Sequence, residues 1–136
     1  MDSARYQAIR EKVVNLYALT GSGNWPEVEK QLTDDFLINE AESLPYGGIY
    51  EGKDALERLY TKVFAYWEDA SLDVTDIAIS EDNVVVILSI LAKSRHTGER
   101  MKMPLCEVLH LRGDLFSGIT PYYFDTLAIA RATGAL

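Results

Sequence analysis

The chain has 136 residues, of which 48% are hydrophobic and 10% aromatic. This length and composition predict one globular domain over residues 1–136, with room for a core and one small-molecule cavity. Thirteen Lys and Arg against 21 Asp and Glu leave a net charge of −8. Because the basic residues do not cluster, the composition argues against nucleic acid or an anionic membrane surface as a partner.

The compartment is indicated by what the sequence lacks. A single cysteine, Cys106, cannot form an intrachain disulfide. The first residues contain no apolar signal core, and no apolar run approaches the length of a membrane span. We therefore expect a cytoplasmic protein without membrane association.

Two helices are expected at the start of the chain. Apolar residues recur at helical spacing over residues 6–20, and this stripe includes Leu16 and Tyr17. It stops at Gly21-Ser22-Gly23, a typical helix end. Asn24 then stands three residues before Glu27, with a proline in the first turn, which is typical of a capped start of a short second helix.

A strand and a third helix follow. Residues 36–40 alternate in polarity and run into a loop rich in proline and glycine, so they predict a strand that ends there. The broadest apolar stripe belongs to the third helix, which we expect to pack on the concave face of a sheet. Its members are Leu56, Leu59, Tyr60, Val63, Phe64 and Trp67.

The second half of the chain reads as an antiparallel meander. From Leu72 onward, strand-length segments are separated by turn residues at 81–83, 95–98 and 112–114, which predict three hairpins. The apolar residues change parity between Val74 and Ile77, so we expect a bulge near Asp76 that bends the sheet. Residues 84–92 are almost continuously apolar and need cover on both faces. Asp125 is expected to cap a short helix over residues 126–130.

This order of elements predicts an α+β domain in which a curved antiparallel sheet wraps on the N-terminal helices. A bent sheet on helices forms a cone with a hollow inside. The apolar strand over residues 84–92 has a second face to cover, so we expect a homodimer through the outer face of the sheet.

Two carboxyls stand on the apolar faces of predicted strands. Glu107 interrupts a row formed by Met103, Leu105 and Leu109, and a buried carboxyl without a partner is costly or has a raised pKa. Glu40 shares a face with Phe36 and Ile38 in the same way. Two alternatives remain open: Glu107 faces a dimer partner or an arginine, and Glu40 is solvated where its strand ends.

Other candidates are weaker. His96 lies in a predicted turn and His110 on the opposite face from Glu107, and no third ligand stands at metal spacing, so we expect no metal and no cofactor. Cys106 reads as a small core residue. Tyr122 reads as a core or interface aromatic, although a tyrosine hydroxyl directed into a cavity can donate to a developing oxyanion.

In the order of several short motifs, the chain resembles the SnoaL-like and ketosteroid-isomerase-like branch of the NTF2-like (cystatin-like cone) superfamily. The resemblance covers nearly the whole chain, so residues 1–136 are identified as a single SnoaL-like domain. The first motif is residues 32–40, which lead into and form the first strand, and the second is residues 50–56, which open the third helix. The other two, residues 103–108 and 116–125, belong to the last two strands.

The resemblance implies roles for individual residues. In ketosteroid isomerases an aspartate at the end of the first strand moves the proton alpha to a ketone, and Glu40 matches its position. A protonated aspartic acid on the penultimate strand donates to the oxyanion, and Glu107 matches that residue. The family's helix tyrosine corresponds to Leu16, with Tyr17 about 100° away around the helix. These departures argue against steroid isomerisation.

We therefore predict cofactor-independent acid–base catalysis on a small apolar carbonyl compound, of the isomerase or polyketide-cyclase type. The alternative is a non-catalytic small-ligand-binding or dimerisation module of the same fold. Glu107 is expected inside the cone as a neutral donor and Glu40 at the mouth as the ionised base, with Tyr17 and Tyr122 as further donors. The expected pocket lining is Leu16, Phe36, Ile38, Leu59, Val63, Met103, Leu105 and Leu109.

Overall fold

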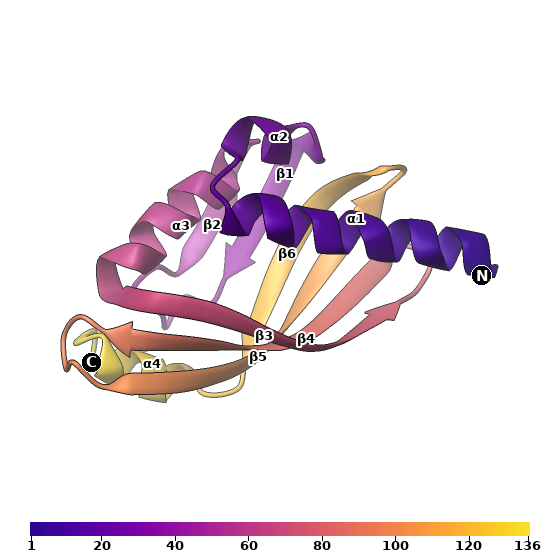
Figure 1. The fold of residues 1–136 in the computed structure, drawn as a ribbon. Coiled ribbons are helices and arrows are strands. Elements are labelled where there is room, and N and C mark those ends of the chain that lie inside the picture. The colour runs from indigo at the N-terminus through magenta and orange to yellow at the C-terminus, as the bar shows by residue number, and fades with distance from the viewer.

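The computed structural model describes all of residues 1–136. Helices and strands cover most of the chain, and Figure 1 shows them in order. The elements are α1 (Ser3–Gly21), α2 (Trp25–Glu29), β1 (Leu32–Glu40), β2 (Gly48–Glu51), α3 (Ala55–Tyr66), β3 (Trp67–Ile79), β4 (Asn83–Ser94), β5 (Arg100–Arg112), β6 (Leu115–Tyr123) and α4 (Thr126–Ala132).

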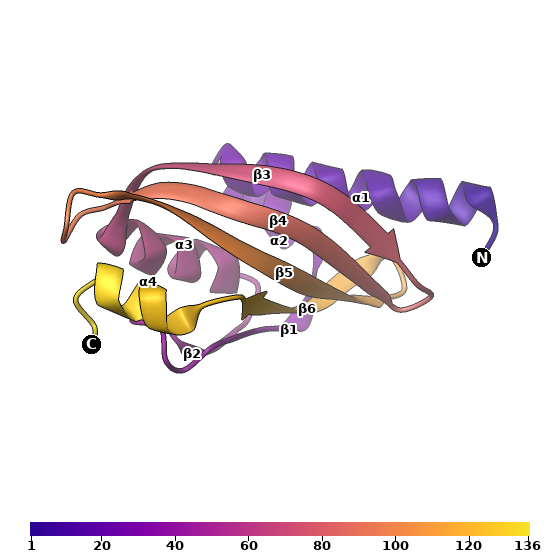
Figure 2. The same cartoon turned by 90° about the horizontal axis from the view of Figure 1, so that it is seen from below.

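The six strands form one curved, unclosed sheet in the order β2-β1-β6-β5-β4-β3. All neighbouring strands are antiparallel except β1 and β6, which run parallel. The helices α1 and α3 lie on one side of this sheet, and Figure 2 shows them behind the long strands β3, β4 and β5. This arrangement confirms the predicted α+β fold with helices on a curved sheet.

Helix α1 presents the expected face, whereas the stripe predicted for α3 is only partly right, because Phe64 is 41% exposed and Trp67 is the first residue of β3. In α1 the side chain of Asp2 accepts from the amide of Arg5 and so caps the first turn, and the buried residues are Ile9, Val13, Leu16 and Thr20. In α3 the buried residues are Ala55, Leu56 and Leu59. Both faces belong to, or border, one cluster of 25 buried residues that also takes the inner face of the sheet.

Bulges bend β3, the edge strand that wraps around the helices. The register between β3 and β4 shifts between Val74 and Asp76, which confirms the bulge predicted from the change of apolar parity. A second shift lies between Glu68 and Ser71, where Asp69 has a φ of +50°. This second bulge of β3 was not predicted, because no alternation of polar and apolar residues marks it.

Two sequence expectations near β1 were wrong. The strand begins at Leu32 rather than Phe36, and the glycine-rich loop leads into a strand, β2, that pairs with β1 through Leu37 and Glu51. Local sequence cannot show this pairing, because a short strand is held by its neighbour rather than by its own pattern.

Asn24 precedes α2 as expected, but its side chain makes no capping hydrogen bond.

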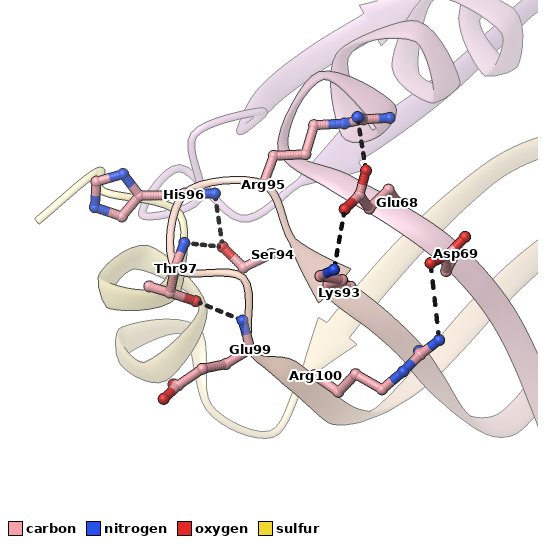
Figure 3. A network of polar contacts seen from close by, with 9 residues as sticks. All are labelled: Glu68, Asp69, Lys93, Ser94, Arg95, His96, Thr97, Glu99 and Arg100. Atoms are coloured by element: carbon pink, nitrogen blue, oxygen red, sulfur yellow. Dashed lines mark hydrogen bonds and ion pairs between the residues drawn. The ribbon is translucent and has the colours of Figure 1, made fainter.

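The turn between β4 and β5 forms hydrogen bonds with the end of α3 and with the C-terminal helix. Figure 3 shows the hydrogen bonds within this turn and the ion pairs that join it and its strands to Glu68 and Asp69 on β3. Ser94, which is 1% exposed, accepts from the amides of His96 and Thr97 and donates to the carbonyl of Ala132 at 2.6 Å. Arg95 donates from Nε to the carbonyl of Phe64 at 2.9 Å. A cation at the carboxyl end of a helix is favourable, so this turn stabilises the last turn of α3.

None of the helices has the length and apolar composition that a membrane crossing requires.

Candidate functional site

One cavity of about 880 Å³ opens between the helices and the concave face of the sheet. Thirteen of its 21 lining residues are hydrophobic. Its only charged side chains are Glu40 and Glu107, and it has no Lys, Arg or His. The lining residues are Tyr17, Ala18, Thr20, Gly21, Ser22, Gly23, Trp25, Glu40, Leu59, Tyr60, Thr61, Val63, Phe64, Ala70, Ser71, Leu72, Val74, Leu88, Ile90, Glu107 and Tyr123.

Glu107 and Tyr17 form a hydrogen-bonded pair across this cavity. Glu107 lies in the middle of β5 and Tyr17 in the last turns of α1, and the tyrosine hydroxyl donates to Oε1 of the glutamate at 2.5 Å. Burial raises the pKa of Glu107, and the hydrogen bond from Tyr17 acts in the opposite direction. Burial and the neighbouring carboxyl also raise the pKa of Tyr17. Burial therefore favours the neutral form of both groups.

Glu40, at the end of β1, is only 2% exposed. No protein group donates to its Oε1. Burial, followed by the charge of Glu107, raises its pKa to about 8. This burial excludes the alternative that Glu40 is solvated where its strand ends. The raised pKa disfavours the ionised form that was expected of Glu40 at neutral pH.

The loop after β1 explains this burial. It folds back through two turns, with the amide of Leu44 donating to the carbonyl of Ala41 and the amide of Gly47 donating to that of Leu44. The loop brings Tyr46, which is 2% exposed, close enough for the charge of Glu40 to act on its hydroxyl. A Cβ on Gly47 would lie 2.3 Å from the carbonyl oxygen of Ala41, so only glycine permits this close return.

The sheet sets the separation between the two carboxyls. Glu107 pairs with Pro121 on β6, and Ile38 on β1 pairs with Ile119 on the other side of the same strand. Strand β6 therefore lies between the strands of the two glutamates, whose axes are about 10 Å apart.

The tyrosine expected from β6 was misplaced by one residue. Tyr122 pairs with Cys106 on the outer face and is 61% exposed, so it is not a cavity donor. Its neighbour Tyr123 lines the cavity instead. Burial, then the charge of Glu40, raises the pKa of Tyr123 well above its ordinary value. The reason is a register shift near Leu111, which moves the inward positions of β6 from even to odd numbers.

The expected lining was right for some residues and wrong for others. Leu59 and Val63 of α3 line the cavity, as does Tyr17. The remaining six are buried in the core beneath or beside the cavity and do not line it: Leu16, Phe36, Ile38, Met103, Leu105 and Leu109. A side chain on the inward face of a strand is expected in the core. This pattern does not show whether the side chain lines the cavity or packs in the filled part of the core.

Part of the cavity wall was not predicted from the sequence. Trp25, Tyr60 and Phe64 form an aromatic series, with ring centroids 5.2 Å apart for the first two and 5.7 Å apart for the last two. Tyr60 and Phe64 were visible in the stripe of the third helix but were taken as core. The bulged segment of β3 adds Ala70 and Ser71, which no pattern indicated.

The histidines and the cysteine contribute nothing to the cavity. His110 pairs through Nδ1 with Oδ1 of Asn83 at 2.7 Å, and His96 lies in the turn between β4 and β5. No three side chains of His, Cys, Asp or Glu come together in a way that could hold a metal ion.

Helices on a curved, unclosed sheet are the fold of NTF2-like proteins. The family description "SnoaL-like domain" matches residues 13–119. The chain belongs to this SnoaL-like family, as its motifs indicated.

Solved structures share this fold. An NTF2-like protein from Burkholderia xenovorans LB400 is 22% identical, with 93% of this chain and 96% of that chain covered and a TM-score of 0.83. A protein assigned as a SnoaL-like polyketide cyclase from Jannaschia sp. CCS1 is 16% identical (96% and 94% covered, TM-score 0.80). A protein with a ketosteroid isomerase-like fold from Catenulispora acidiphila DSM 44928, in complex with trimethylamine, is 14% identical (91% and 92% covered, TM-score 0.75). No protein with a curated description matches in sequence.

Proposed function

We propose that the protein catalyses cofactor-independent proton transfer on a small, largely apolar carbonyl compound, as an isomerase or cyclase does. The observation that carries this proposal is the pair of carboxyls in one apolar cavity, of which Glu107 is held by Tyr17 and Glu40 is free on Oε1. Perturbed acids in an enclosed cavity are typical of acid–base sites.

The two carboxyls take different roles in this proposal. Glu40 in its ionised form removes the proton on the carbon next to the carbonyl, and it returns that proton at another position. Its pKa of about 8 makes it a stronger base than an ordinary glutamate. At pH 7 about a tenth of the molecules have Glu40 ionised, so the rate should rise with pH up to about 8.

Glu107 and Tyr17 serve the oxygen of the substrate. A protonated Glu107 accepts from Tyr17 on Oε1 and keeps its own O–H for the carbonyl oxygen. As negative charge develops on that oxygen, the donor shortens its hydrogen bond in a site of low polarity, where such a bond stabilises most. Tyr17 thereby fulfils the donor role expected of it, but through Glu107.

The similar structures support small organic molecules as the class of ligand, and they do not identify the compound. A related fold is assigned as a polyketide cyclase, and another holds trimethylamine, so relatives take small organic molecules. The cavity of this chain, at about 880 Å³, has the size of a site for such compounds.

The test is exchange of the hydrogen alpha to the carbonyl in heavy water, followed by proton NMR with a panel of neutral cyclic ketones. Glu40→Gln should lower exchange by about 10² to 10⁴, whereas Glu107→Gln keeps a donor and should retain part of the activity. Glu42→Gln is the matched control, because Glu42 is exposed and lies outside the cavity lining. Binding of ketones without exchange above buffer would reject catalysis and favour the binding-module alternative.

We also propose that the protein is a homodimer through the outer face of the sheet. Ile87 and Leu91 on β4 are 40% and 36% exposed there, and Tyr122 on β6 adds a 61% exposed ring. These residues are the uncovered second face of the apolar strand noted in the sequence.

A further inference from the structure

The charge of the cavity defines its ligand more narrowly than its size does. Among 21 lining residues there are two carboxyls and no cationic side chain, and the whole chain carries a net charge of −8. A carboxylate, phosphate or thioester-linked nucleotide would meet no positive partner in this cavity. A positively charged ligand would meet two potential ones.

Glu40 is the group whose hydrogen bonding is incomplete. It is 2% exposed and lines the cavity, and its Oε1 receives no hydrogen bond from the protein. A buried oxygen without a partner costs free energy that a donor from a ligand would recover. Glu107 differs in this respect, because Tyr17 already donates to it.

The groups around Glu40 cannot supply the missing positive charge. The titratable groups that act on it or feel its charge are Glu107, Tyr46, Tyr50 and Tyr123, and all of them are acids. Lys62 lies over the ring of Tyr50, 5.0 Å from its centroid, but it does not line the cavity. No cation of the protein therefore favours the ionised form of Glu40, whereas a cationic ligand would favour it.

The aromatic wall suits a cation with an apolar body. Trp25, Tyr60 and Phe64 line the cavity in series. The faces of such rings attract an ammonium group electrostatically, and their edges and faces pack against hydrocarbon.

We infer that the ligand of this cavity is an apolar amine, bound as its ammonium ion, with an N–H donating to Glu40 and its hydrocarbon part against Trp25, Tyr60 and Phe64. The inference rests on the proposed function only in that both concern the same cavity. A ligand with an amino group on the carbon next to a carbonyl would satisfy both the inference and the proposed function. Its positive charge and its transferable proton would both lie at the carboxylate of Glu40.

Binding on these terms releases a proton. The free cavity holds Glu40 as a neutral acid, and the ammonium ion converts it to the carboxylate, so one proton leaves for the solvent. At pH 7 the release should be about 0.9 proton per amine bound, and affinity should rise about tenfold for each pH unit between 6 and 7.5. A neutral ligand of the same shape should show neither effect.

The experiment is isothermal titration with three probes of one shape: benzylamine, benzyl alcohol and benzoate. Two buffers with different ionisation enthalpies report the proton release. We expect benzylamine to bind at least tenfold more tightly than benzyl alcohol, and benzoate at least tenfold more weakly than the alcohol. Equal affinity for the amine and the alcohol, or amine binding without proton release, would overturn the inference.

Variants of the two glutamates test which carboxyl binds the ammonium group. Glu40→Gln should remove both the amine preference and the proton release, so that benzylamine and benzyl alcohol bind with similar affinity, and Glu42→Gln should change nothing. If Glu107→Gln has this effect instead, the assignment to Glu40 is wrong.

The outcomes separate this inference from the proposed function. Exchange on neutral ketones without a preference for amines removes the inference alone. A preference for amines without any exchange removes the proposed catalysis alone, and leaves an ammonium-binding module.

Discussion

Burial of Glu40 should make the protein less stable as pH rises, which is opposite to the usual behaviour of a salt-bridged carboxylate. Its pKa is 4.5 when unperturbed and about 8 in the folded protein. Between these values the folded state binds more protons than the unfolded state, so the free energy of unfolding falls with pH. The contribution of Glu40 is fully present below pH 4.5 and is lost as pH rises through about 8.

The size of this effect follows from the same two values. Each pKa unit corresponds to about 1.36 kcal/mol, so the full loss is roughly 5 kcal/mol, of which roughly 3 kcal/mol has occurred by pH 7. Because Glu40 is only 2% exposed, solvent screening reduces it little. Against a typical total of about 5–15 kcal/mol, a loss of this size is easy to measure.

The assay is urea unfolding at pH 5, 6, 7 and 8, followed by tryptophan fluorescence and far-UV circular dichroism. We expect the midpoint of the wild type to fall over this range, and that of Glu40→Gln to fall much less. Glu42→Gln should follow the wild type, since its side chain is exposed. The reasoning is refuted if the wild type and Glu40→Gln have parallel pH dependences, or if the wild type becomes more stable toward pH 8.

Three further outcomes can be measured. Tyr17→Phe removes the hydrogen bond that lowers the pKa of Glu107, so NMR titration should show that pKa moving upward; an unchanged value contradicts the pairing. Leu59→Ala should lower the free energy of unfolding by about 2 kcal/mol, the lower end for a core leucine, because this side chain borders the cavity; urea unfolding with a loss under about 0.5 kcal/mol contradicts that placement. Sedimentation should show a dimer, whose interface needs about 1,000 Å², and Ile87→Lys on the outer face should give a monomer; a wild-type monomer at high micromolar concentration rejects the interface.

The fold was largely predictable because its signals are local. Helix stripes, turn residues between the long strands and the parity change before Asp76 are all read within a few positions of the chain, and the structure confirms them. The strand β2 was not predictable in this way. Its residues Gly48–Glu51 are held by β1 through hydrogen bonds that the sequence does not reveal.

The site was only partly predictable, and the errors have two physical causes. Parity placed Glu107 inside the cone, where it lines the cavity, but a register shift in β6 exchanged Tyr122 for Tyr123. The burial of Glu40 depends on a loop that returns over the end of β1, a tertiary event with no local signal.

The positions of the two glutamates are explained by the cavity and not by the packing of the core. A fold that needed nothing but a core would continue the row of Met103, Leu105 and Leu109 through position 107 with another apolar residue, since buried carboxyls are less favourable than packed hydrocarbon. Glu40 is the stronger case, because its Oε1 has no protein donor and its charge has no counterion in the lining. We propose that this buried side chain, which lowers stability at neutral pH and whose Oε1 meets no donor within the chain, has its partner in the molecule that fills the cavity.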